Sequence, residues 1–184
     1  MHRARTSRLL LPSLVLIAAA LAGCETMSKK QCLSADWFQV GYQAGRDGRE
    51  RAHIEDIAES CAKVNVTPDR RRYFDGWEQG LREYCTPENG FYLGRNGTRV
   101  RSVCPPATAG RFEDAYRRGY RIFEARQYVD QLEDRRRNLE NLLEKANTDE
   151  KLKRIRDELA ELDIRLRYAR DTLQQIESET RPPR

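Results

Sequence analysis

Between residues 35 and 120 the apolar positions follow a helical period and repeat one pattern of aromatic and small residues. An aromatic residue is followed three positions later by a small one, then directly by a second aromatic, and three positions after that by glycine. These positions, i, i+3, i+4 and i+7, lie on one face of an α-helix. The three copies are Phe38-Gly41-Tyr42-Gly45, Tyr73-Gly76-Trp77-Gly80 and Phe112-Ala115-Tyr116-Gly119. They begin 35 and 39 residues apart, a spacing typical of helical repeats.

The small residues of this face need a physical reason, because glycine inside a helix costs about 0.5–1 kcal/mol relative to alanine. Small residues four positions apart let a second backbone approach closely. We therefore predict close helix–helix packing, with aromatic rings filling glycine notches. The alternative is a groove that stacks a sugar or a peptide on Tyr42, Trp77 and Tyr116.

Capping residues and apolar stripes place the individual elements. Helices are expected over about residues 35–48, with Ser34 as N-cap, over about 52–63, and from Pro68 to about Tyr84, with Thr67 as N-cap. Residues 91–95 and 98–103 flank Asn96-Gly97. Asn-Gly is a strong signal for a two-residue β-turn, so a short β-hairpin is expected there.

The last third of the chain predicts two long helices. From about residue 109 to 177 no proline interrupts the helical pattern. A heptad seam comprises Val129, Leu132, Leu139, Leu143 and Ala146, and then Leu152, Ile155, Leu159, Leu162, Leu166, Ala169, Leu173 and Ile176. The register breaks after Ala146, so we expect a helical hairpin folded at Asn147–Thr148. Roughly thirty residues in each arm would give a length of ~45 Å. Arg136 occupies an expected seam position. The alternative is one long helix that dimerises.

The first 23 residues have the features of a secretion signal. Three arginines precede an apolar run from Leu9 to Leu21, which is too short to span a bilayer comfortably. Leu21-Ala22-Gly23-Cys24 resembles the bacterial lipobox. The resemblance implies cleavage before Cys24, its acylation with fatty acids such as palmitate, and a membrane anchor. Glu25 favours the outer membrane, with the protein facing the periplasm.

Removal of this segment lowers the net charge from +5 to +2, because it carries three arginines and no acid. Such a small charge creates no long-range field for nucleic acid, and no nucleic-acid partner is expected. Charged residues make up 34% of the chain and are densest in its last third, which indicates two parts.

Four further cysteines predict two disulfides in an exported protein. They are Cys32, Cys61, Cys85 and Cys104. Of the three possible pairings we favour Cys32–Cys61, because antiparallel helices would bring these ends together. Cys85–Cys104 would then close the expected β-hairpin. Zinc is the alternative, but no C-x-x-C pair is present and His53 is the only histidine after residue 23. We expect no metal and no cofactor.

The fold class expected is mainly α: a small disulfide-stapled helical repeat domain with a short β-hairpin, followed by a long helical hairpin. The boundaries are 1–23 for the signal peptide, 24–33 for the lipidated cysteine and tether, 34–120 for the repeat domain, 121–178 for the coiled-coil hairpin, and 179–184 for a disordered tail.

The order of cysteines, aromatics and glycines from Cys32 to Tyr120 is similar to that of the bacterial lipoproteins known as domain of unknown function 2799. The positions that carry the resemblance include Asp36-Trp37, Gly45-x-Asp47-Gly48, Pro68-Asp69, Tyr84-Cys85 and Cys104. The resemblance implies an exported, disulfide-containing lipoprotein, and it supplies no catalytic residue.

No catalytic set emerges from the residue types. His53 is the only histidine base available to a serine or cysteine nucleophile, and its position favours a surface side chain. Paired carboxylates are the remaining option, which would make a cell-wall hydrolase; the acids in or near the repeat helices are Asp36, Asp47, Asp69 and Asp75. Asp75 and Asp114 occupy the same position of the repeat, which favours a structural role for them. We therefore expect a non-enzymatic envelope lipoprotein. It would contact the membrane through its lipid and an envelope protein through its coiled-coil tail, which could also form a homodimer. The alternative is a glycan- or peptide-binding module that uses the aromatic–glycine face.

Overall fold

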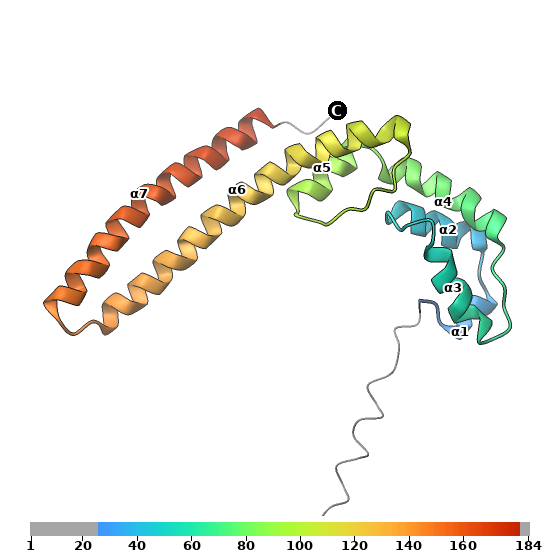
Figure 1. Cartoon of the computed structure of the whole chain (residues 1–184), viewed down its shortest axis with the longest axis horizontal. Coiled ribbons are helices and arrows are strands. Elements are labelled where there is room, and N and C mark those ends of the chain that lie inside the picture. Colours follow the sequence, from blue (N-terminus) through green and yellow to red (C-terminus); the bar gives the residue numbers. More distant parts are fainter. Residues whose placement is uncertain (1–25, 181–184) are drawn as a thin grey trace, which may run out of the picture.

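The computed structural model describes residues 26–180, which form an elongated, mainly α-helical molecule (Figure 1). Short helices gather at one end, and two long helices extend from them side by side. The described elements are α1 (Lys29–Leu33), α2 (Trp37–Arg46), α3 (His53–Ala62), α4 (Arg70–Tyr84), α5 (Pro87–Arg95), α6 (Pro106–Lys145) and α7 (Asp149–Glu179). The expected mainly α fold with a long helical hairpin is confirmed.

The helix starts are set by different caps from those expected. Ser28 caps α1 through a capping box with Gln31, and Ser34 is the C-cap of that helix. Asp36 caps α2 by accepting a hydrogen bond from the backbone N–H of Phe38. Asp69, rather than Thr67, caps α4. In both cases the expected cap lay two residues too early. At an N-cap, aspartate accepts a hydrogen bond from a backbone N–H of the first turn, as serine and threonine do.

The expected β-hairpin is wrong: residues 87–95 form α5, and no strand occurs within residues 26–180. Thr86 accepts a hydrogen bond from the N–H of Asn89, and Pro87 stands at the start of the helix, where its missing N–H costs nothing. Asn96 is the C-cap, and Gly97 has a φ of 65°. A helix end and a tight β-turn both use Asn-Gly for its left-handed backbone, so the dipeptide alone did not distinguish them.

The helical hairpin lies where the seam predicted it. The chain turns at Ala146–Thr148, and Thr148 caps α7 by accepting a hydrogen bond from the N–H of Lys151. The buried seam consists of Val129, Leu132, Leu139, Ile155, Leu162, Leu166 and Ala169. Arg136 sits at its expected seam position and remains half-exposed.

The hairpin and the short helices share helix α6 and one apolar cluster. Phe91 of α5 and Ala115 and Ile122 of α6 are buried together, and Leu173 and Ile176 near the end of α7 pack against them. The expected boundary at residue 120 therefore falls inside a continuous helix. The base of the hairpin is therefore connected to the domain by α6, which continues into it, and by the end of α7, which packs against it.

Candidate binding surfaces of the domain and the hairpin

The first aromatic–glycine faces meet each other, because α2 and α4 lie side by side and parallel. A Cβ on Gly41 would lie 1.9 Å from the carbonyl oxygen of Tyr73, and one on Gly45 would lie 2.1 Å from that of Trp77. Gly76 in return faces the Phe38 carbonyl. The predicted close packing is therefore present. The notches are filled by backbone carbonyl oxygens rather than by aromatic rings, an arrangement typical of Cα–H···O contacts between helices.

Helices α5 and α6 form a second parallel pair of the same kind. A Cβ on Gly94 would lie 2.1 Å from the Tyr116 carbonyl oxygen, and one on Gly119 would lie 2.2 Å from that of Phe91. The partner of the third repeat copy is thus a fourth copy, Pro87-x-x-Gly90-Phe91-x-x-Gly94. Sequence reasoning missed this copy because proline replaces its first aromatic and because Asn96-Gly97 resembled a β-turn.

The two pairs agree beyond the glycines. Gly48 and Gly97 both adopt positive φ after the first helix of their pair, and each packs under an aromatic ring of the second helix. The indole N–H of Trp77 donates a hydrogen bond to the Arg49 carbonyl at 3.0 Å. In the second pair the hydroxyl of Tyr116 donates to the Thr98 carbonyl at 3.1 Å. The domain is therefore built from one helix-pair unit used twice.

Beside Trp77 lies a cavity of about 380 Å³ between α4 and residues 103–108. Its walls include Trp77, Leu81, Cys85, Val103, Pro105 and Thr108, together with Glu78 and Arg82. It is mainly apolar with two charged side chains, which is the composition of a small-ligand pocket. The aromatic–glycine face itself is closed by packing, so this cavity is the part of the face that a ligand could reach.

Charged groups surround the exposed edge of the first pair. The guanidinium of Arg51 lies 4.1 Å from the centre of the Phe74 ring, a cation–π contact. Arg70 donates two hydrogen bonds to Glu55, at 2.9 and 2.5 Å, which lower the pKa of Glu55. Both side chains are more than half exposed, so the pair contributes little to stability.

Four tyrosines of the domain have a raised pKa. Burial raises the pKa of Tyr73 to about 12, and its hydroxyl makes no hydrogen bond within the described chain. Burial also raises the pKa values of Tyr84 and Tyr116. The hydrogen bond that Tyr42 donates to Glu83, 2.7 Å long, raises the pKa of Tyr42. All four hydroxyls stay protonated at neutral pH.

The acids considered for catalysis have other contacts or stand alone on the surface. Asp36 and Asp69 cap helices, and Asp114 pairs with Arg117. Asp75 is exposed and makes no polar contact within residues 26–180. His53 lies 3.3 Å from Asp56 at the start of α3. No group of three metal-ligating side chains occurs in the described part of the chain.

Both expected disulfides are present. Cys32–Cys61 holds α1 against α3, and Cys85–Cys104 joins the end of α4 to the segment before α6. The expected lipid attachment site Cys24, the expected signal segment 1–23 and residues 181–184 of the expected tail lie outside the described residues. Among the described helices, none has a stretch apolar and long enough to cross a bilayer.

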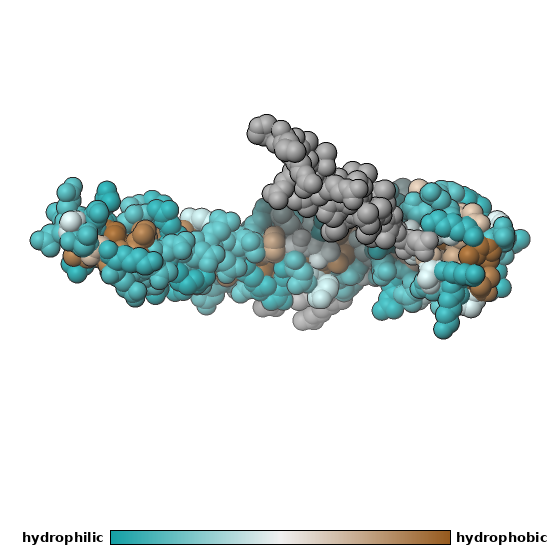
Figure 2. All heavy atoms as spheres, turned by 90° about the horizontal axis from the view of Figure 1, so that it is seen from below, coloured by the Kyte–Doolittle hydropathy of each residue, from teal (hydrophilic) through white to brown (hydrophobic). Residues whose placement is uncertain are grey.

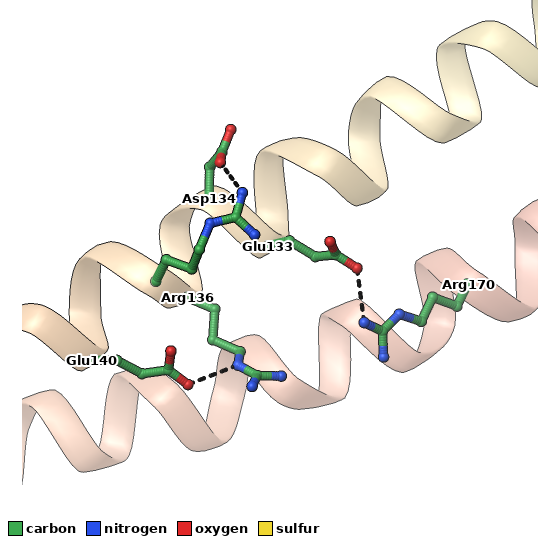
Figure 3. Close-up of polar contacts among 6 residues, drawn as sticks. Glu133, Asp134, Arg136, Glu140 and Arg170 are labelled. Atoms are coloured by element: carbon green, nitrogen blue, oxygen red, sulfur yellow. Dashed lines mark hydrogen bonds and ion pairs between the residues drawn. The ribbon is translucent and has the colours of Figure 1, made fainter.

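The hairpin has two unlike faces. One is covered by ion pairs: Arg136 bonds to Glu140 at 2.9 Å within α6, and Glu133 accepts a bond from Arg170 of α7 at 2.8 Å (Figure 3). The other also carries ion pairs, Arg135 with Glu158 and Arg165 with Glu161, but it exposes the apolar side chains of Tyr128, Leu142 and Tyr168 as well. Ile164 is a fourth exposed apolar side chain of the hairpin. Hydrophobic residues, in brown, are visible near the tip of the hairpin among hydrophilic ones, and others appear midway along the molecule and at its opposite end (Figure 2). Sequence reasoning did not single out these four residues, although Tyr128 and Leu142 are two heptads apart.

Residues 36–121 match the family model described as Protein of unknown function (DUF2799). The resemblance expected from the sequence is confirmed over this segment. The DUF2799 segment begins at the N-cap of α2 and ends inside α6, so it contains both helix-pair units. No curated protein and no solved structure matches the chain. Most of the hairpin lies beyond the DUF2799 segment.

Proposed function

We propose that this chain is a non-enzymatic lipoprotein of the bacterial cell envelope, lipid-anchored at Cys24 in the outer membrane, that acts as an adaptor through its helical hairpin. The observation that carries the proposal is the hairpin itself. Helix α6 continues for 24 residues beyond the DUF2799 segment before it ends at Lys145, a projection of about 36 Å. Only the base of this projection packs with the domain, through Ile122, Leu173 and Ile176. The remainder would let a membrane-anchored protein reach a partner.

The order of features along the chain supports the proposed anchor. The first described residue stands two positions after Cys24, and α1 is fixed to the domain by the Cys32–Cys61 disulfide. A lipid on Cys24 would therefore hold the domain close to the bilayer. Metabolic labelling with a fatty acid tests this step: we expect label on the wild-type chain and none on Cys24→Ser. A labelled Cys24→Ser protein would contradict the anchor.

Site-specific photo-crosslinking in cells tests the adaptor role. Crosslinkers at the exposed positions Asn141 and Arg156, near the tip of the hairpin, should capture a second envelope protein. A crosslinker at Tyr92, which is 65% exposed on the domain, is the matched control. Capture from Tyr92 alone would contradict the proposal. So would cell-wall hydrolase activity that Asp75→Asn abolishes and that survives deletion of residues 125–184.

The cavity beside Trp77 supports an alternative, a glycan- or peptide-binding module. A ligand in this cavity would contact Trp77 and would change its fluorescence. The chain has two tryptophans, so Trp37→Phe isolates the signal of Trp77 and Trp77→Phe removes it. This alternative requires a saturable change with cell-wall fragments in Trp37→Phe and none in Trp77→Phe. An unchanged spectrum in both would exclude it.

A further inference from the structure

One face of the hairpin is hollowed along its length. Three hollows of about 490, 200 and 250 Å³ lie between α6 and α7. The first and second share Arg135 and Glu158, and the second and third share Arg165. They therefore form a segmented groove from the tip of the hairpin towards the domain, divided by the Arg135–Glu158 ion pair that joins α6 to α7. We call the side of the hairpin that carries this groove the groove face.

Side chains line the groove at heptad spacing on both arms. Tyr128, Arg135 and Leu142 follow each other at seven-residue intervals on α6. Arg154, Glu161 and Tyr168 do the same on α7. Seven residues are nearly two turns, so each set forms a straight stripe. Leu142 is 54% exposed, Tyr128 50% and Tyr168 71%. The stripes thus combine three exposed apolar side chains with three charged ones, so a helix that packs on them must offer both apolar and complementary charged side chains.

Charge divides the hairpin into two regions. Residues 135–156, the tip, carry eight Lys and Arg against four Asp and Glu. Residues 121–134 and 157–179, the base, carry five against eleven. The tip is thus basic, with a net charge of +4, and the base is acidic, with a net charge of −6. A partner helix that is acidic throughout would be attracted by the tip and repelled by the base, and so would an anionic bilayer.

Unpaired charges beside the groove show the same division. Lys145, Lys151 and Arg154 are exposed at the tip, and the described chain offers them no ion-pair partner. Glu124 and Asp171 are exposed next to the two tyrosines of the base and are likewise unpaired among residues 26–180. Unpaired cations therefore stand beside Leu142, and an unpaired acid lies one helical turn from each tyrosine. Each region also has unpaired charges of the opposite sign among the described residues, such as Glu144 and Glu150 at the tip and Arg121 and Arg167 at the base, so the division is one of net charge.

The distances between the two regions match on the two arms. Tyr128 and Leu142 are 14 residues apart on α6, and Arg154 and Tyr168 are also 14 residues apart on α7, about 21 Å in each case. A second copy turned by 180° would therefore place its tip on this base and its base on this tip at the same time. A two-fold interface of this kind is self-complementary.

We infer that two copies of this chain pair antiparallel through their groove faces, with the basic tip of each hairpin on the acidic base of the other. The apolar contact joins Leu142 of one copy to Tyr128 and Tyr168 of the other. Lys145, Lys151 and Arg154 lie opposite Glu124 and Asp171. The result is a four-helix bundle that leaves the ion-paired face of Figure 3 outward and free for the envelope partner of the proposed function. The pairing itself does not depend on the lipid anchor.

A charge-reversal exchange tests this arrangement with the full chain. One variant, Lys151→Glu with Arg154→Glu, reverses the tip. The other, Glu124→Lys with Asp171→Lys, reverses the base. Each is co-expressed as two copies that carry different C-terminal tags, solubilised in detergent, captured through one tag and quantified through the other. Circular dichroism of each variant confirms that the helices remain folded.

The wild-type chain should capture its second copy. Each variant with itself should capture about tenfold less, because like charges then meet at both ends of the interface. The tip variant with the base variant should recover wild-type capture, because every reversed charge meets a reversed partner. All pairs carry the same anchor sequence, so co-residence in a detergent micelle cannot produce this pattern. A wild-type chain that captures no second copy, or a mixed pair that fails to recover, would overturn the antiparallel pairing.

Discussion

Gly76 of α4 lies directly against the backbone carbonyl of Phe38 of α2: a Cβ on Gly76 would stand 2.0 Å from that oxygen. Backbone cannot yield as the end of a side chain can, so Gly76→Ala must push the two helices apart. We expect the free energy of unfolding to fall by about 2–4 kcal/mol. Chemical denaturation followed by circular dichroism measures this change, and Gly80→Leu should prevent folding altogether.

Gly110 provides the matched control, because it is also a helical glycine but has no atom within 4 Å of an added Cβ. Gly110→Ala should raise the free energy of unfolding by about 0.5–1 kcal/mol through helix propensity alone. Equal effects of the two substitutions would show that close approach of α2 and α4 does not hold the domain together. A Gly80→Leu protein with unchanged melting would lead to the same conclusion.

The sequence predicted those parts of the fold that many residues specify together, and it failed where only two residues or a tertiary contact decide. The seam from Val129 to Ile176 has many equivalent positions, so its helices and its turn could be read directly. The β-hairpin was wrong because Asn96-Gly97 signals only a positive φ, which a helix end also uses. Helix α5 pairs with α6 because Gly90 and Gly94 pack on α6. This is a tertiary contact, and no local sequence pattern predicts it.

The binding surfaces were less predictable than the fold. The aromatic–glycine pattern was visible in the sequence, but it marks the packing interface rather than an open groove. The cavity beside Trp77 depends on where residues 103–108 cross α4, and that path is fixed by the Cys85–Cys104 disulfide. The groove of the hairpin lies between two helices and depends on how far they separate. A heptad pattern gives the seam but not this separation.

Tyr73 should make the domain sensitive to alkali. It is fully buried, its hydroxyl has no hydrogen-bond partner within the described chain, and its pKa is raised to about 12. In the unfolded chain its pKa is about 10. The folded state therefore resists ionisation, so its stability is complete below pH 10 and falls as the pH rises towards 12.

Tyr73→Phe removes both the unpaired hydroxyl and this titration. We expect an increase of about 1 kcal/mol in the free energy of unfolding at pH 7 and a smaller loss of stability between pH 10 and 12. Denaturation at both ends of this range measures the two effects. A Tyr73→Phe protein that is less stable at pH 7 would show that the hydroxyl has a partner, such as a bound water molecule.

The Cys85–Cys104 disulfide should stabilise the domain and also shape the cavity. It closes a loop with a sequence separation of 19 residues, so the double variant Cys85→Ala with Cys104→Ala should lose roughly 3 kcal/mol of stability. Residues 103–108 would no longer be held against α4, and the environment of Trp77 would change. Tryptophan fluorescence of the folded variant, with Trp37→Phe in the background, reports this. An emission spectrum identical to that of the protein with the intact disulfide would show that the disulfide does not shape the cavity.

Arg136 is the position where the seam of the hairpin departs from its own pattern. It follows Leu132 and precedes Leu139, yet its guanidinium turns outward to Glu140, whose carboxylate raises the pKa of Arg136 (Figure 3). Exposed ion pairs of this kind contribute little to the stability of the fold, whereas a leucine at position 136 would extend the apolar seam. We expect Arg136→Leu to raise the free energy of unfolding by about 1 kcal/mol.

Arg137→Leu is the control, because Arg137 is exposed on the hairpin surface and pairs with Asp134, and it should change stability by less than about 0.5 kcal/mol. Thermal denaturation in low and high salt separates the contribution of apolar burial from that of charge attraction, because salt screens only the latter. If Arg136→Leu is less stable than wild type in low salt and equal to it in high salt, attraction between Arg136 and the surrounding carboxylates, rather than apolar burial, determines the residue at this position.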